Sequence, residues 1–196
     1  MNELERNINF LIETDKLKSI YRRARIKSDK NRRENSAEHS WHVSLMGFTL
    51  VDYCSEKIDV LKVLKMLIIH DIVEIYAGDT FAFDEENIIK EQGKKEYEAA
   101  EKIFSLLPNK QYTEMKDLWI EFEENKTNEA KFSKAIERSI PVLQNMQNNG
   151  GSWIAHGSVS KEQVLQRNKE LKYIAPKLWD YISAQIEMAK EKGWLV

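Results

Sequence analysis

Apolar residues recur at every third or fourth position along almost the whole chain, which is the period of an α-helix. The first segment shows this with Leu4, Ile8, Leu11 and Ile12 on one face. Only seven glycines and three prolines interrupt the 196 residues, so a fold of many short strands and tight turns is disfavoured. The sequence therefore predicts an all-α fold, a single domain over residues 1–196 built as a bundle of about seven or eight helices.

Capping and stop signals divide this pattern into separate helices. One helix is expected at about residues 39–54 with Ser36 as its N-cap. The next is expected at about 59–76, capped by Asp59 and ended by Gly78. Residues 27–38 between the first two segments are expected to form a polar loop. Further helices are predicted within residues 96–107, 113–124, 128–147, 160–168 and 176–193.

Charge and cysteine content limit the classes of partner and compartment. The formal net charge is -2, with 30 basic and 32 acidic residues, so the basic excess typical of nucleic-acid binding is absent from the sequence. The first 19 residues carry acids and no long apolar run, which argues against a signal peptide or a membrane span. Cys54 is the only cysteine, so no intramolecular disulfide can form. We expect a cytoplasmic protein without a nucleic-acid or membrane partner.

Three of the four histidines lie in two short windows, EHSWH at 38–42 and IIHDIVE at 68–74. His39 is in helical phase with the apolar Val43 and Met46, so its side chain is expected to face the core. Asp71 falls into the same phase as Leu64 and Ile68 on the second helix. A carboxylate on an apolar face costs free energy unless a cation or a donor pairs with it. The residues alone leave two readings open, a divalent metal site and a buried His–Asp pair.

The sequence around these windows carries a more specific signal. The segments RRENSAEHSWHVSLM at 32–46 and LIIHDIVEIYAGDT at 67–80 resemble the two signature windows of the HD-domain phosphohydrolases, and in particular those of the 5'-deoxynucleotidase-like branch. The later segment NEAKFSKAIERSIPVLQN at 128–145 resembles the helix that supplies the last metal ligand in that family. The resemblance thus has a motif core at about residues 32–145, and it implies the helical HD-domain fold.

The resemblance implies one divalent metal ion, bound by His39, His70 and Asp71. The family's fourth ligand is an aspartate, and this chain has Glu137 at that point. Glutamate keeps the carboxylate but adds a methylene, so it can bind only if its backbone lies farther back or its rotamer differs. Manganese, cobalt, iron, zinc and magnesium all remain compatible with mixed nitrogen and oxygen ligands.

Two further acids and two arginines receive roles from the same resemblance and from the local basic cluster. Glu74 is expected to transfer a proton, and Asp79 to contact the substrate or Glu74. The alternatives are a solvated salt-bridge acid for Glu74 and a helix N-cap for Asp79. Arg22 matches the substrate-binding arginine of the family's L-K-x-x-x-R pattern, and Arg33 belongs to the same basic cluster. Both are candidate substrate-binding residues; a solvated basic surface is the alternative.

The implied activity is hydrolysis of a phosphate monoester, with a (deoxy)nucleoside 5'-monophosphate as the substrate. Another small phosphorylated or cyclic nucleotide would keep the enzyme class and change only the substrate. A ligand-binding HD protein with little turnover is a third reading, because Glu137 replaces the usual aspartate. The resemblance also implies a homodimer.

Overall fold

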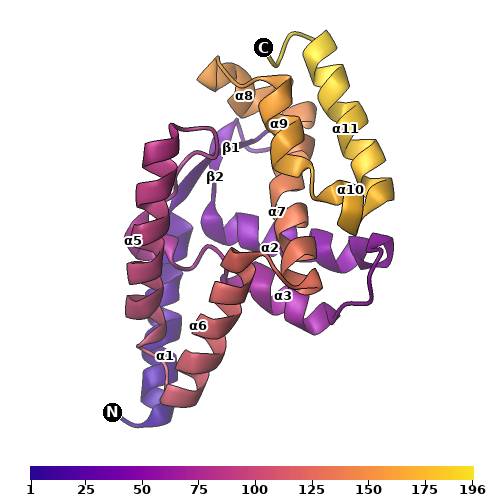
Figure 1. Cartoon of the computed structure of the whole chain (residues 1–196). Coiled ribbons are helices and arrows are strands. Elements are labelled where there is room, and N and C mark those ends of the chain that lie inside the picture. The colour runs from indigo at the N-terminus through magenta and orange to yellow at the C-terminus, as the bar shows by residue number, and fades with distance from the viewer.

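The protein is described by a computed structural model that covers residues 1–196 apart from the side chain of Glu86. The fold is helical, as predicted: α7 is central and contacts α2, α3, α6, α9 and α11, whereas α1 and α5 lie to one side, away from it (Figure 1). The long helices are α1 (Glu3–Thr14), α2 (Ser36–Leu50), α3 (Val60–Ile69), α5 (Glu86–Phe104), α6 (Asn109–Glu124), α7 (Asn128–Gln147), α9 (Lys161–Asn168) and α11 (Pro176–Glu191). The described chain also has three short α-helices, α4 (Glu74–Ala77), α8 (Gly151–His156) and α10 (Leu171–Ile174), and two 3-10 helices, Asp15–Ser19 and Val51–Tyr53.

A two-stranded hairpin precedes α2 and corrects the loop expected there. Strand β1 (Tyr21–Ile26) pairs antiparallel with β2 (Arg32–Asn35), with Arg25 opposite Arg33. The basic sequence of these strands lacks the alternation of apolar and polar residues that normally reveals a strand, so periodicity could not predict it. Pairing between the two segments overrides the weak local preference. The hairpin carries Arg22 and Glu34, whose side chains are both largely withdrawn from solvent.

The helix predicted at 59–76 is interrupted in the structure. Asp59 caps α3 as expected, because its Oδ1 accepts hydrogen bonds from the backbone N–H groups of Leu61 and Lys62. The helix ends at Ile69, and a turn over residues 70–73 leads into α4. Positions after Ile69 therefore cannot be assigned to a helix face from the phase of α3. Within α3 itself, Ile68 is 54% exposed, although its helical phase predicted that it would be buried.

The start of α2 also differs from the sequence-based expectation. The N-cap is Asn35, whose Oδ1 accepts from the backbone N–H of Glu38, while the Glu38 carboxylate accepts from the backbone N–H of Asn35. This reciprocal pair is a capping box, and it fixes the first turn of the helix. Ser36 is thus the first helical residue instead of the cap, and its hydroxyl is free to contact the site.

Two apolar cores meet at the turn over residues 70–73. One core gathers buried residues of α2, α3, α7 and α11, including Val43, Leu67 and Ile136. The other gathers residues of α1, α5 and α6, and it includes Ile72 and Val73 from the turn itself. Packing on both sides fixes the turn, so the polar side chains that it carries are held in place. Within the described part of the chain, no helix has the length and apolarity that crossing a bilayer requires.

Candidate metal centre

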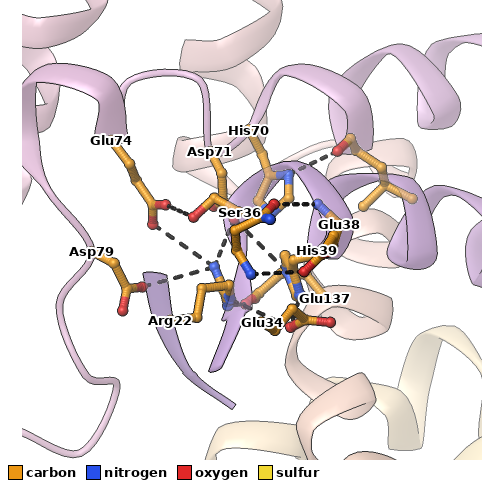
Figure 2. A network of polar contacts seen from close by, with 12 residues as sticks. Arg22, Glu34, Ser36, Glu38, His39, His70, Asp71, Glu74, Asp79 and Glu137 are labelled. Carbon is orange, nitrogen blue, oxygen red and sulfur yellow. Dashed lines mark hydrogen bonds and ion pairs between the residues drawn. The ribbon is translucent and has the colours of Figure 1, made fainter. Parts of the chain in front are cut away.

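His39, His70 and Asp71 converge, as the sequence predicted, at the junction of α2 with the turn after α3 (Figure 2). One ligand atom from each of the three lies within 4.8 Å of the others. All three residues are buried, and His39 has no exposed surface at all. His39 comes from the first turns of α2, and the other two come from the break in the predicted second helix.

The ring of His70 has a defined orientation. Its Nδ1 lies 2.8 Å from the backbone carbonyl oxygen of Leu67, and because a carbonyl can only accept, the ring nitrogen donates. In the neutral ring the lone pair therefore lies on Nε2, which is 3.0 Å from Oδ1 of Asp71 and forms no hydrogen bond in the described structure. Two lone pairs that face each other repel, and a cation between them removes the conflict.

His39 has an acid behind its ring, although neither of its ring nitrogens forms a hydrogen bond with the described residues. Its Nδ1 lies 3.4 Å from Oε2 of Glu34, and its Nε2 lies 3.9 Å from Oδ2 of Asp71. The other oxygen of Glu34 accepts a 2.7 Å hydrogen bond from Gln144 on α7. Burial lowers the pKa of His39, and the charge of Arg22 lowers it further, so the imidazole is neutral. A neutral imidazole is the form that binds a metal.

The donor set fits a divalent cation. His39 Nε2 and His70 Nε2 are buried nitrogen atoms without a hydrogen-bond partner among the described residues, and both lie near the carboxylate of Asp71. Buried polar atoms are rarely left unpaired, because doing so costs about 1–3 kcal/mol each. Two imidazoles with a carboxylate suit the first-row transition metals, so these residues could hold such an ion.

Arg22 reaches into the same site from β1 and lies among carboxylates from three other elements. Its Nη1 is 2.6 Å from Oδ2 of Asp71, and 3.8 Å from both Oε1 of Glu74 and Oδ1 of Asp79. Its Nη2 is 3.9 Å from Oε1 of Glu137. Burial alone would lower the pKa of Arg22, but these four carboxylates raise it above its ordinary value, so the guanidinium stays charged.

Glu74 and Asp79 both face this site instead of solvent (Figure 2). Oε2 of Glu74 accepts a 2.5 Å hydrogen bond from the hydroxyl of Ser36. Burial, and then the charge of Asp71, raise the pKa of Glu74 well above its ordinary value. Burial also raises the pKa of Asp79, although Arg22 opposes it. The buried position of Glu74 excludes the solvated salt-bridge acid considered as its alternative reading.

Of the two remaining predicted site residues, the structure places Glu137 near the site and Arg33 away from it. Glu137 on α7 lies close to Arg22, but it is not one of the three residues that form the metal-binding group. Burial would raise its pKa, yet Arg167 and Arg22 lower it to about 2, so it is ionised. Arg33 is exposed on β2 and does not line the cavity, because residues alternate sides along a strand and Glu34 takes the inward position. The structure thus does not bring Arg33 to the site.

A cavity of about 250 Å³ opens over His70 and Asp71. Its walls include several polar residues that sequence reasoning missed, among them Arg138 on α7 and Arg167 on α9. Arg138 follows Glu137 directly and lies inside the third family-like segment, so a signal for it existed. Nothing in the sequence pointed to Arg167, which only the packing of α9 brings to the cavity. Glu34 and Gln144, which support His39 from behind, were likewise given no role.

Comparisons with known proteins agree with this geometry. The HD domain family matches residues 14–179. The chain is 30% identical to a 5'-deoxynucleotidase HDDC2 of Xenopus laevis and 28% identical to the one of Homo sapiens, over 138 residues and 70% of this chain in each case. The match spans 66% and 65% of those two relatives, just under two thirds of their length.

Solved structures show the same fold. A predicted metal-dependent phosphohydrolase from Magnetospirillum magnetotacticum superposes with a TM-score of 0.92 at 39% identity, over 99% of this chain and 96% of that one. A protein from Pyrococcus horikoshii superposes with a TM-score of 0.66 at 24% identity, over 91% of this chain and 99% of that one, which supports the fold alone. With a family match over most of its length, and with His39, His70 and Asp71 placed together, the chain belongs to the HD domain family.

Proposed function

We propose that this protein is a metal-dependent phosphohydrolase that cleaves phosphate monoesters, with deoxynucleoside 5'-monophosphates as substrates. The observation that carries the proposal is the convergence of two unpaired imidazole nitrogens on the Asp71 carboxylate. The substrate class is supported by the relatives called 5'-deoxynucleotidases, and the reaction type by the similar phosphohydrolase from Magnetospirillum magnetotacticum.

In this proposal His39, His70 and Asp71 bind the cation, and Glu137 adds a fourth ligand, an ionised carboxylate from α7. A divalent ion bound there supplies Lewis acidity toward a phosphoryl oxygen and lowers the pKa of a water molecule. Manganese, cobalt, iron, zinc and magnesium all fit a site of two nitrogens and carboxylate oxygens. Glu34, whose Oε2 lies 3.4 Å from Nδ1 of His39, is proposed to favour the orientation in which Nε2 faces the site.

Glu74 is the proposed proton-transfer residue. Burial and the neighbouring charge of Asp71 raise its pKa above the ordinary value, which makes the carboxylate a stronger base toward a proton in the site. The hydroxyl of Ser36 holds one of its oxygens, and the other faces Arg22. Asp79 lies beside Glu74, at the same 3.8 Å from Nη1 of Arg22, and is proposed to position that guanidinium or a substrate hydroxyl. Arg22 keeps these acids together and is proposed to face the phosphate when substrate binds.

The experiment is a phosphate-release assay on the purified protein after loading with each candidate metal. Deoxynucleoside 5'-monophosphates are expected to be hydrolysed, and Asp71→Asn is expected to abolish release. Asp52→Asn, which changes an exposed acid in the 3-10 turn just after α2, is the matched control and should keep full activity. Absence of phosphate release from every monophosphate with every metal would rule the proposal out.

We further propose that the chain forms a homodimer in the cytosol. The apolar stripe of α1 supports a pairing surface, because Leu4, Leu11 and Ile12 are between 61% and 70% exposed. Two copies of one stripe can cover each other across a two-fold axis. Light scattering should give the mass of a dimer for the wild type and a monomer for Leu11→Glu. Leu61→Glu, which changes an equally exposed leucine on α3, should remain dimeric; a monomeric wild type contradicts the proposal.

A further inference from the structure

The cavity over the metal centre has a second, cationic end. Arg138 from α7 and Arg167 from α9 both line the cavity that includes His70 and Asp71. Glu137 stands between the two ends, since its Oε1 is 3.9 Å from Nη2 of Arg22 and 3.7 Å from Nη2 of Arg167. Contacts from Arg167 to Glu137, from Glu137 to Arg22 and from Arg22 to Asp71 therefore connect the cationic end with the metal centre.

The arginines of the cavity differ in how far their charges are already satisfied. Arg22 is fully engaged, with a 2.6 Å hydrogen bond to Asp71 and four more carboxylates within 4.0 Å. Arg167 meets Glu137 only at 3.7 Å, which is beyond hydrogen-bond distance. Arg138 forms neither an ion pair nor a hydrogen bond with any residue that the structure describes. Donor groups of Arg138 and Arg167 thus remain available to a ligand.

Two other cations near the cavity are less suited to bind a ligand. Lys134 is paired with Glu123 at 2.8 Å. The guanidinium carbon of Arg23 lies 5.9 Å from the centre of the Phe81 ring, where the cation is attracted to the aromatic face. Arg33, which the sequence suggested as a substrate ligand, is exposed outside the cavity. The uncommitted charge inside the cavity is therefore that of Arg138 and Arg167.

The placement of these two arginines has an electrostatic cost in the ligand-free protein. Arg138, Arg167 and Arg22 line the same cavity, and Glu137 lies within 4.0 Å of two of them, Arg22 and Arg167. Like charges at a partly buried site repel each other strongly, and a bound anion reverses that cost. A guanidinium presents parallel N–H groups that match two oxygens of a phosphate, so two such forks can hold one phosphate group from adjacent sides.

We propose that Arg138 and Arg167 form a phosphate-binding subsite that holds the phosphoryl group of the substrate beside the metal centre. This inference rests on the proposed phosphomonoesterase function, and it adds phosphate contacts from α7 and α9 to that of Arg22, in place of Arg33. No bond is made or broken at the subsite; the two arginines neutralise the dianion and orient it. They are binding residues, so their loss should affect affinity for the anion before it affects the chemical step.

The first experiment measures binding of inorganic phosphate to the metal-free protein, kept in EDTA, by titration calorimetry. Arg138→Gln and Arg167→Gln should each weaken phosphate binding by about 10-fold or more, because each removes charge-assisted hydrogen bonds. Arg33→Gln removes the same charge from an exposed position and should leave the dissociation constant unchanged. Arg138→Gln breaks no ion pair of the described structure, so this variant still tests the subsite even if Arg167→Gln fails to fold. Wild-type protein that binds no phosphate, or variants that bind as the wild type does, would overturn the subsite.

The second experiment measures KM and kcat of the metal-loaded protein with a deoxynucleoside 5'-monophosphate. Both cavity variants should raise KM by about 10-fold or more, and Arg167→Lys should restore part of it, because lysine keeps the charge without the fork. The two proposals fail differently. If the wild type hydrolyses no monoester but phosphate affinity still depends on Arg138 and Arg167, only the enzymatic function is wrong. If hydrolysis is present and both variants keep the wild-type KM and phosphate affinity, only the subsite is wrong.

Discussion

Nη1 of Arg22 lies 2.6 Å from Oδ2 of Asp71, so a buried guanidinium contacts the carboxylate that is proposed as a metal ligand. Four further carboxylates lie within 4.0 Å of the same side chain. In protein without metal, Arg22 is therefore the cation that keeps these acids from repelling one another. A bound metal ion would share that task.

Arg22→Met tests this relationship. In the presence of EDTA the substitution should lower the free energy of unfolding by about 3–5 kcal/mol, since it leaves buried carboxylates without their partner. A divalent cation should then stabilise the variant more than it stabilises the wild type. Urea denaturation with and without metal measures both effects. Arg33→Met, an exposed arginine of the same hairpin, should change stability by less than about 0.5 kcal/mol. Equal losses of unfolding free energy for the two variants would show that Arg22 does not stabilise the buried carboxylates.

Glu34→Gln tests the support behind His39. The substitution removes the carboxylate that lies 3.4 Å from Nδ1 and so weakens the preference for the tautomer with a free Nε2. Affinity for Mn²⁺ should fall by about 10-fold or more. Glu38→Gln, four residues along and on the surface side of the capping box, should keep wild-type affinity, because glutamine also fits that position. Calorimetric titration compares the three proteins; an unchanged dissociation constant for Glu34→Gln would exclude the orienting role.

Glu96 predicts a pH dependence of stability. Burial raises its pKa to about 7, although Gln92 donates a 3.1 Å hydrogen bond to it. Its folded-state pKa lies above the unfolded one, so its favourable contribution is complete below about pH 4.5 and is lost as the pH rises through about 7. Glu96→Gln should therefore gain stability relative to the wild type between about pH 5 and about pH 8. Thermal melts at both values check this, with Glu98→Gln as an exposed control on α5. A constant difference between Glu96→Gln and wild type would contradict it.

Two glycines give opposite predictions for stability. Gly93 lies within α5, and an added Cβ would meet no atom within 4 Å, so Gly93→Ala should stabilise the protein by about 0.5–1 kcal/mol. Gly150 has φ +89°, and an added Cβ would lie 2.6 Å from Cδ1 of Ile154 and 2.7 Å from Cγ of Trp194. Gly150→Ala should therefore destabilise by at least about 1–2 kcal/mol. Chemical denaturation of both variants measures these changes in unfolding free energy. A stabilising Gly150→Ala substitution would contradict the backbone geometry at Gly150.

Much of the fold and the centre of the site could be predicted from the sequence, because helical periodicity and two motif windows are local signals. The bounds of α7 and the cap of α3 at Asp59 were predicted correctly. The hairpin was missed, since its stability comes from pairing and not from the pattern of either strand. The burial of Asp71 was predicted through a helical phase that ends at Ile69, so the result was right although the assumed helix was wrong. The contribution of Arg167 depends on how α9 packs, which no local pattern encodes.

The most direct test of the account is a calorimetric titration of metal-free protein with Mn²⁺. We predict binding of one ion per chain for the wild type, and its loss in His39→Gln, His70→Gln and Asp71→Asn. His42→Gln, which changes an exposed histidine three positions from His39, should bind as the wild type does. Wild type without binding, or a wild-type affinity in all three site variants, would contradict the claim that these side chains converge on a cation.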